Sequence, residues 1–196
     1  MKKYVAEFLG TFALTLAVAL SLTGDFPVPT PILAALVLGL FVYFIGHISG
    51  AHINPAVTVG LWSVRKIRTD EAVYYMLSQF AGATAVLLLI SATVGLATLT
   101  VSGGAMVGVA ELAGTFFFGF GIASVVYGRT PGTLSGAIVG CSLLFGIAVA
   151  AVLGSNGVLN PAVALGIESF NVLYVLGPIA GSVLGMQAYK YLDRAG

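Results

Sequence analysis

Six long apolar stretches constrain most strongly what this chain can fold into. They lie near residues 4–23, 31–48, 71–95, 106–127, 134–153 and 173–192. Each has close to the roughly 20 helical residues that cross the hydrocarbon core of a bilayer. Charged residues make up only 8% of the chain, against about 25% in soluble domains. The sequence therefore predicts an all-α membrane protein with six transmembrane helices.

The basic residues predict the orientation of these spans. The connections at 24–31, 98–104 and 154–171 contain no Lys or Arg, so all eight basic residues fall on one side of the bilayer. By the positive-inside rule both termini are predicted to be cytoplasmic. The first span follows two lysines as in a signal peptide, but no small-residue cleavage site follows it. We therefore expect a retained helix, and the plasma membrane as the location.

Three landmarks occur twice in the same order. "AEFLGTF" at 6–12 returns as "AELAGTF" at 110–116, "QFAGATAV" at 79–86 loosely matches "PIAGSVLG" at 178–185, and Asn-Pro-Ala stands at 54–56 and 160–162. Each half then holds three spans, and because three is odd the second half is upside down relative to the first. We predict a single transmembrane domain over residues 1–196, built as an inverted 3+3 repeat of 1–104 and 105–196.

The two Asn-Pro-Ala tripeptides have the signature of helix starts. Asn is a preferred N-cap, and Pro is favoured at the first helical position. The motif residues are Asn54, Pro55, Ala56, Asn160, Pro161 and Ala162. Short helices are predicted over 55–62 and 161–170, each roughly 14 Å long at 1.5 Å per residue. Two such half-helices, entering from opposite faces and meeting head to head, would together cross the bilayer.

A broken span is tolerated in a membrane only where it is buried in protein or lines a wet cavity. The approaches to both tripeptides, "GHISGAHI" and "GSNGVL", are Gly-rich and predicted to be extended, with carbonyl groups facing a pore. The residues predicted to present carbonyl acceptors to the pore are Gly50, Ala51, His52, Asn156, Gly157 and Val158. Asn54 and Asn160 would donate to one water at the midplane, which interrupts proton hopping, while the positive helix ends repel cations. This pattern predicts a passive channel for water or small uncharged solutes.

At these residues the sequence resembles the aquaporin or major intrinsic protein family, across essentially the whole chain. The resemblance rests on "SGAHINPAVT" at 49–58, the repeated "AE…GTF", Gln79 and "GPIAG" at 177–181. It implies six spans with two re-entrant half-helices, a pore through each subunit, and a homotetramer in the lipid bilayer. The expected partners are water and small neutral solutes such as glycerol or urea. A net charge of +1 gives no reason to expect nucleic acid, one cysteine excludes Cys-rich metal sites, and no cofactor is predicted.

One position departs from the family pattern. Members usually carry Arg directly after the second Asn-Pro-Ala, where this chain has Val163. Counting back along the sequence from each Asn without gaps places the other filter positions, although Leu33 or Leu38 could replace Ala34. The predicted selectivity filter is Ala34, Ala148, Gly157 and Val163. Such a ring would be wide and apolar and would lack the guanidinium that repels cations.

Two glutamates lie inside predicted spans, where ionisable residues are functional by default. We expect Glu7 and Glu111 each to accept hydrogen bonds from the extended loop of its own half. If they instead bound a coupling ion, the chain would be an ion-coupled secondary transporter, which also uses inverted repeats with broken helices. An intramembrane hydrolase would need Ser49 next to a histidine base and an oxyanion hole, which these spacings do not promise. We therefore predict that the chain is not an enzyme.

Overall fold

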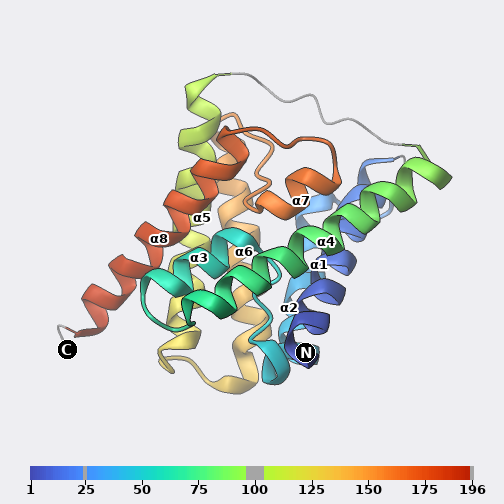
Figure 1. The fold of residues 1–196 in the computed structure, drawn as a ribbon. Helices are drawn as coiled ribbons and strands as arrows, with labels where there is room; N and C mark the ends of the chain where they lie inside the picture. Colours follow the sequence, from blue (N-terminus) through green and yellow to red (C-terminus); the bar gives the residue numbers. More distant parts are fainter. Residues whose placement is uncertain (24–25, 96–103, 195–196) are drawn as a thin grey trace.

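The computed structural model describes residues 1–23, 26–95 and 104–194, and the part of the chain that it describes is helical without any strand (Figure 1). The long helices are α1 (Lys2–Leu22), α2 (Thr30–Ser49), α4 (Thr69–Thr93), α5 (Ala105–Val126), α6 (Ser135–Val152) and α8 (Leu173–Arg194). The short helices are α3 (Pro55–Ser63) and α7 (Pro161–Gly166), and a 3-10 turn, η1 (Gly132–Leu134), leads into α6. The predicted all-α fold is confirmed. Residues 24–25 and 98–103 of the predicted basic-free connections lie outside the described residues.

The first five long helices are long and apolar enough to cross a membrane, with η1 extending α6 to the range Gly132–Val152. α8 lies where the sixth span is predicted and has 22 residues. It is less apolar than the others because its last turns carry Gln187, Lys190 and Asp193.

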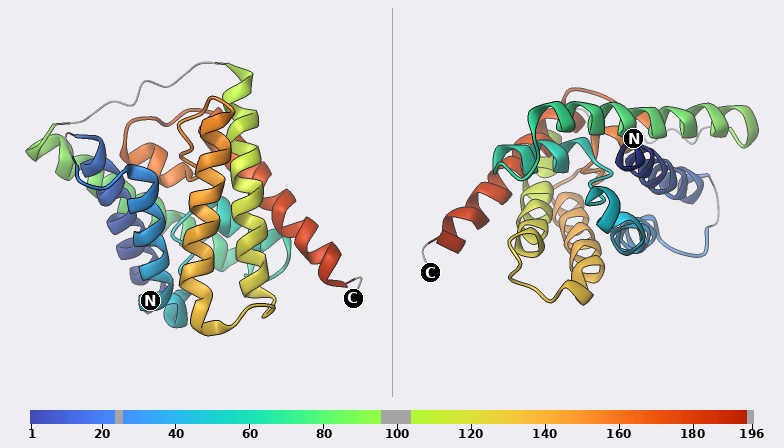
Figure 2. Two further views of the ribbon diagram at one scale, coloured as in Figure 1. Left: turned by 180° about the vertical axis from the view of Figure 1, so that it is seen from behind. Right: turned by 60° about the horizontal axis from the view of Figure 1, so that its bottom comes forward.

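Small residues bring the long helices into close contact. On α8, Gly177, Gly181 and Gly185 follow one another at four-residue intervals and face the backbone carbonyls of α5. A Cβ on Gly82 of α4 would lie 2.5 Å from the carbonyl oxygen of Phe8 on α1, so only glycine fits there. Contacts of this kind let transmembrane helices associate without a hydrophobic driving force between them. Figure 2 shows the two short helices beside the long ones; α3 packs mainly against α8, and α7 packs mainly against α4.

The short helices begin where the sequence predicts but differ in length. α3 starts at Pro55 and has nine residues, close to the predicted 55–62. α7 starts at Pro161 but has six residues, so it is about 9 Å long rather than about 14 Å. The prediction of 161–170 is wrong because the chain leaves the helix after Gly166: Glu168 takes a φ of 56°, and the Ser169 N–H bonds back to the Ala164 carbonyl at 2.8 Å.

Candidate functional site

Each tripeptide follows a residue with an unfavourable backbone conformation. Ile53 has a φ of 37° and Leu159 a φ of 53°. Left-handed geometry costs residues with a Cβ about 1–2 kcal/mol and is rarest for β-branched side chains such as Ile. The surrounding structure must therefore hold both residues in place, and the two buried glutamates do so.

Glu7 lies on α1, fully buried beneath the first loop. The N–H of Ile53 donates to its Oε2 at 2.7 Å, and the N–H of His52 donates to its Oε1 at 2.9 Å. The Ser49 hydroxyl donates to Oε1 at 2.7 Å, and Gln79 Nε2 on α4 donates to Oε2 at 2.8 Å. The carboxylate thus has donors on both oxygens, from the loop and from a neighbouring helix.

Glu111 repeats this arrangement on α5. It is fully buried, and the N–H of Leu159 donates to its Oε2 at 2.7 Å. The N–H of Val158 donates to Oε1 at 3.0 Å, and the Ser155 hydroxyl donates to the same oxygen at 2.5 Å. Both glutamates are therefore placed as loop supports, and both carboxylates lie behind their loops.

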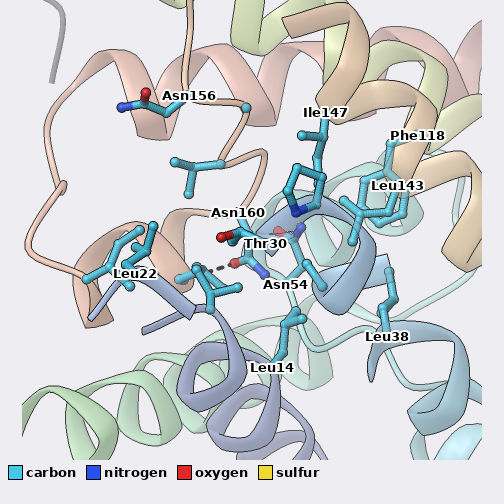
Figure 3. Close-up of a pocket in the computed structure, with 17 residues that line it drawn as sticks. Leu14, Leu22, Thr30, Leu38, Asn54, Phe118, Leu143, Ile147, Asn156 and Asn160 are labelled. Carbon is cyan, nitrogen blue, oxygen red and sulfur yellow. Dashed lines mark hydrogen bonds between the residues drawn. The ribbon is translucent and has the colours of Figure 1, made fainter. Parts of the chain in front are cut away.

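The side chains of Asn54 and Asn160 lie side by side where the two short helices meet (Figure 3). Asn54 Oδ1 accepts from the Ala56 N–H at 2.8 Å, and Asn160 Oδ1 accepts from the Ala162 N–H at 3.0 Å, so both cap their helices. Asn54 Nδ2 donates to the Leu159 carbonyl at 2.9 Å, and Asn160 Nδ2 donates to the Ile53 carbonyl at 3.1 Å. Because a carboxamide has two N–H donors, each Asn keeps one for another acceptor.

A cavity of about 240 Å³ is lined by these two asparagines. Its lining also includes Leu22, Thr30 and Pro31, where α1 ends and α2 begins. Apart from Thr30 and three asparagines, the side chains along it are apolar. The apolar set comprises Leu14, Val18, Leu22, Pro31, Ala34, Leu38, Phe118, Leu143, Ile147, Val158, Val163 and Ile167. The lining of the cavity is therefore mainly apolar, and the amide groups of Asn54 and Asn160 are among its few polar groups.

Three of the four predicted filter residues line this cavity: Ala34, Gly157 and Val163. Ala148 does not, since it is exposed on the outer face of α6 and its neighbour Ile147 lines the cavity instead. Successive side chains of a helix point about 100° apart. A count along the sequence that is wrong by one residue therefore selects a side chain on the outer face of α6 instead of one that faces the cavity. The buried pair Leu143 and Ile147, four residues apart, was the available signal in the sequence.

Of the six residues predicted to present carbonyls to the pore, those of the second loop line the cavity and those of the first loop do not. Asn156, Gly157 and Val158 line the cavity, whereas Gly50, Ala51 and His52 are not among its lining residues. The side chain of His52 is buried: its Nδ1 lies 3.2 Å from the Thr58 hydroxyl, and its ring packs edge-on against Tyr75. Within residues 1–23, 26–95 and 104–194, no three His, Cys, Asp or Glu side chains cluster in a way that could hold a metal.

Sequence reasoning also missed a group of cavity residues on the long helices. Leu14, Val18 and Leu22 follow one another at four-residue intervals on α1, and Phe118 joins them from α5. This spacing puts the three α1 residues on one helix face. The spacing was visible in the sequence, but it does not distinguish a pore wall from a helix contact.

The sequence profile of the major intrinsic protein family matches residues 1–189. The chain belongs to the major intrinsic protein family. It is 33% identical to "Aquaporin AqpM" of Methanothermobacter marburgensis, over 97% of each chain. It is 29% identical to "Aquaporin NIP1-1" of Arabidopsis thaliana, over 99% of this chain and 75% of the plant protein.

A solved relative shares the fold. The crystal structure of the aquaglyceroporin from Plasmodium falciparum superposes with a TM-score of 0.64 at 22% identity, over 98% of this chain and 95% of the other. As a member of the major intrinsic protein family, the chain is an integral membrane protein that forms a channel for water or small solutes. Members of this family are channels rather than enzymes.

Proposed function

We propose that the chain conducts water and small uncharged solutes such as glycerol or urea passively, along the cavity and past Asn54 and Asn160. The observation that carries this proposal is the pairing of the two carboxamides in the lining of the cavity. With one N–H of each engaged across the midplane, the second N–H of each is available to a passing oxygen atom. A water held by both would turn its own hydrogens outward, which interrupts proton transfer along the file.

The proposed selectivity filter consists of Ala34, Ile147, Gly157 and Val163. Its side chains are apolar, and Val163 stands where a guanidinium would otherwise donate hydrogen bonds to water and repel cations. Residues 156–158 line the cavity together with apolar side chains of α1 and α6, which supports our proposal that their carbonyls supply acceptors to the solute. A solute with hydroxyl or amide groups on one side and carbon on the other fits this surface. An ion would lose its hydration shell there without receiving charged ligands.

The second candidate function is ion-coupled secondary transport, which requires a titratable or charged group at the solute site. Glu7 and Glu111 are the acidic residues nearest the midplane, and both are committed to loop N–H groups behind the cavity wall. We therefore favour a passive channel. Stimulation of uptake by an imposed proton or sodium gradient would support the transporter instead.

The wider assembly is proposed on the same basis. We propose one channel domain over residues 1–196 built from the repeats 1–104 and 105–196, with the carbonyls of Gly50, Ala51 and His52 serving the inner half of the pore. The family resemblance supports a homotetramer with one pore per subunit. The distribution of Lys and Arg supports cytoplasmic termini, and we propose the plasma membrane as the location.

Permeability of proteoliposomes under osmotic shock tests the channel proposal. Water flux, and glycerol or urea flux, should exceed those of empty liposomes and should follow the solute gradient alone. Two neighbouring variants provide a matched control: Ile147→Trp fills the cavity and should block flux, whereas Ala148→Trp adds the same bulk to the outer face of α6 and should not. Fluxes no faster than in empty liposomes for every solute would overturn the proposal.

A further inference from the structure

A second hollow shares no lining residue with the channel cavity. It has a volume of about 520 Å³ and is lined by Trp62, Ser63, Arg65, Ile67, Arg68 and Thr69. These residues form the turn from α3 into α4, at the end of the molecule where both chain termini lie (Figure 1). None of them lines the channel cavity, so the proposed conduction pathway does not account for them.

The walls of this hollow are held in place by hydrogen bonds. The Trp62 indole N–H donates to the Thr69 hydroxyl at 3.0 Å, and the Ser63 carbonyl accepts from Gln187 Nε2 on α8 at 2.8 Å. Arg65 sits between them with a left-handed φ of 63°, and its N–H bonds to the Trp62 carbonyl at 2.9 Å. Glycine would adopt this conformation without strain. Arg65 therefore carries backbone strain that the surrounding hydrogen bonds must hold in place.

Positive charge dominates this hollow. Arg68 pairs with Asp70 at 3.1 Å, in an ion pair whose side chains are 81% and 61% exposed and therefore well hydrated. The other ion pairs found in the described ranges join Lys3 to Glu71 and Arg129 to Asp193, so none of them includes Arg65. Two arginines thus line the hollow, and only Arg68 has a described carboxylate partner, which it binds through Nε and Nη2. Arg65 and the remaining edge of Arg68 match the geometry of a phosphate group, which a guanidinium can bind through two parallel hydrogen bonds.

An exposed aromatic ring indicates the source of that phosphate. Trp62 is 47% exposed although its indole N–H already has a partner, so the ring offers apolar surface rather than a hydrogen bond. A soluble anion would gain nothing from such a ring, whereas Trp is the typical side chain at the boundary between headgroups and acyl chains. The basic end of the molecule also faces the leaflet that carries anionic lipids, if the termini are cytoplasmic as proposed.

We propose that this hollow binds the headgroup of an anionic phospholipid, with Arg65 and Arg68 on the phosphate and Trp62 against the glycerol and upper acyl chain. The site is independent of the conduction pathway. A failure of the channel proposal would leave it standing, and its own failure would not affect the permeability test.

Trp62 is the sole tryptophan of the chain, so its fluorescence reports on this site alone. The full protein is placed in lipid vesicles of mixed phosphatidylglycerol and phosphatidylcholine, with brominated chains on one lipid at a time to quench the fluorescence. Corrected for mole fraction, brominated phosphatidylglycerol should quench more effectively, by about five-fold for each arginine that binds phosphate. Equal quenching by the two lipids would overturn the proposal.

Substitutions test whether Arg65 and Arg68 cause the preference for phosphatidylglycerol. R65Q/R68Q should abolish it, whereas Lys2→Gln, which removes a positive charge elsewhere at the same end, should leave it unchanged. A preference that persists in R65Q/R68Q would overturn the assignment. If inorganic phosphate abolishes the preference for phosphatidylglycerol, the hollow is a site for soluble anions, and the proposal of a lipid headgroup as its ligand is overturned. If R65Q/R68Q yields no folded protein, Arg68→Gln, whose side chain is exposed, provides the same comparison and should weaken the preference.

Discussion

The loop before α3 and the loop before α7 place equivalent asparagines but differ in what holds them. Glu7 receives hydrogen bonds from its loop and also from Gln79 on a neighbouring long helix. Both glutamates accept a hydrogen bond from a serine, Ser49 or Ser155, but the repeat-equivalent position of Gln79 on α8 is Pro178, which has no side-chain donor. The first loop is therefore anchored to α4, whereas the described hydrogen bonds to Glu111 all come from its own loop.

The two halves also differ in how much space they leave. α3 has nine residues and α7 only six. The cavity of about 240 Å³ borders residues 156–158 of the second loop, whereas residues 50–52 of the first loop do not line it. We infer a division of labour, in which the first half supplies a firmly packed support and the second half shapes the passage that selects the solute. The predictions below test this division.

The largest expected effect is on stability, from changing the buried glutamates. Glu7→Gln removes a charge that receives four described hydrogen bonds and turns an amide N–H towards the N–H donors of the loop. Loss of charged hydrogen bonds with donors left unpaired should lower the free energy of unfolding by about 3 kcal/mol or more. Folded yield and thermal unfolding in detergent measure this. Glu111→Gln should also destabilise, but less, because no helix side chain equivalent to Gln79 donates to it.

Solute selectivity should change little in whatever Glu7→Gln protein does fold. A clean loss of transport with normal yield and normal assembly would contradict the supporting role of Glu7.

Removing Gln79 isolates the anchor that the second half lacks. Gln79→Leu takes one donor from Glu7 while the loop N–H groups stay in place, so we expect a loss of about 1–2 kcal/mol in the free energy of unfolding. Gln187→Leu is the matched control, because that amide is half-buried at the end of α3 and far from either carboxylate. If both variants unfold at the same temperature, the first loop does not depend on α4 for support.

Val163→Arg should increase the selectivity for water over glycerol, and so tests whether the second half selects the solute. A guanidinium in the ring would narrow it and donate to water, so the ratio of glycerol to water flux should fall by about tenfold, which corresponds to about 1.4 kcal/mol in barrier height. Stopped-flow measurements on proteoliposomes give both fluxes. Val163→Met, similar in reach but uncharged, separates narrowing from charge. An unchanged glycerol or urea flux in Val163→Arg would show that Val163 is not part of the filter.

The smallest expected effect concerns the corrected filter position. Ile147→Ala removes three carbons from the cavity wall and should raise glycerol flux by about threefold, or about 0.7 kcal/mol in barrier height. Ala148→Val, on the outer face of the same helix, should leave the flux at the wild-type value. The reverse outcome would restore Ala148 to the filter and move the α6 register by one residue.

Local chemistry and the repeat made much of this structure predictable. Asn-Pro fixes a cap and a first helical residue through neighbours in sequence, so the starts of α3 and α7 followed directly. The duplicated "AE…GTF" located Glu7 and Glu111 as a pair, because two copies of one fold need the same buried partner under the same loop.

Tertiary contacts decided what the sequence could not. α7 ends at Gly166, where a Cβ would lie 3.1 Å from the Ala83 carbonyl oxygen on α4, and no local signal reports such a neighbour. Which face of α6 points towards the cavity depends on how α6 packs against α5 and α2. Counting across a loop of unknown geometry therefore gave Ala148, which is exposed, rather than Ile147, which lines the cavity.

The crossed hydrogen bonds at the midplane have a consequence for biogenesis. Asn54 in the first repeat completes its bonding only on a carbonyl of the second, and Asn160 only on a carbonyl of the first. A ribosome that has released only the leading three spans has made a half whose key amide still lacks its acceptor. We therefore expect permeation competence to arise late, when the trailing spans have inserted and docked.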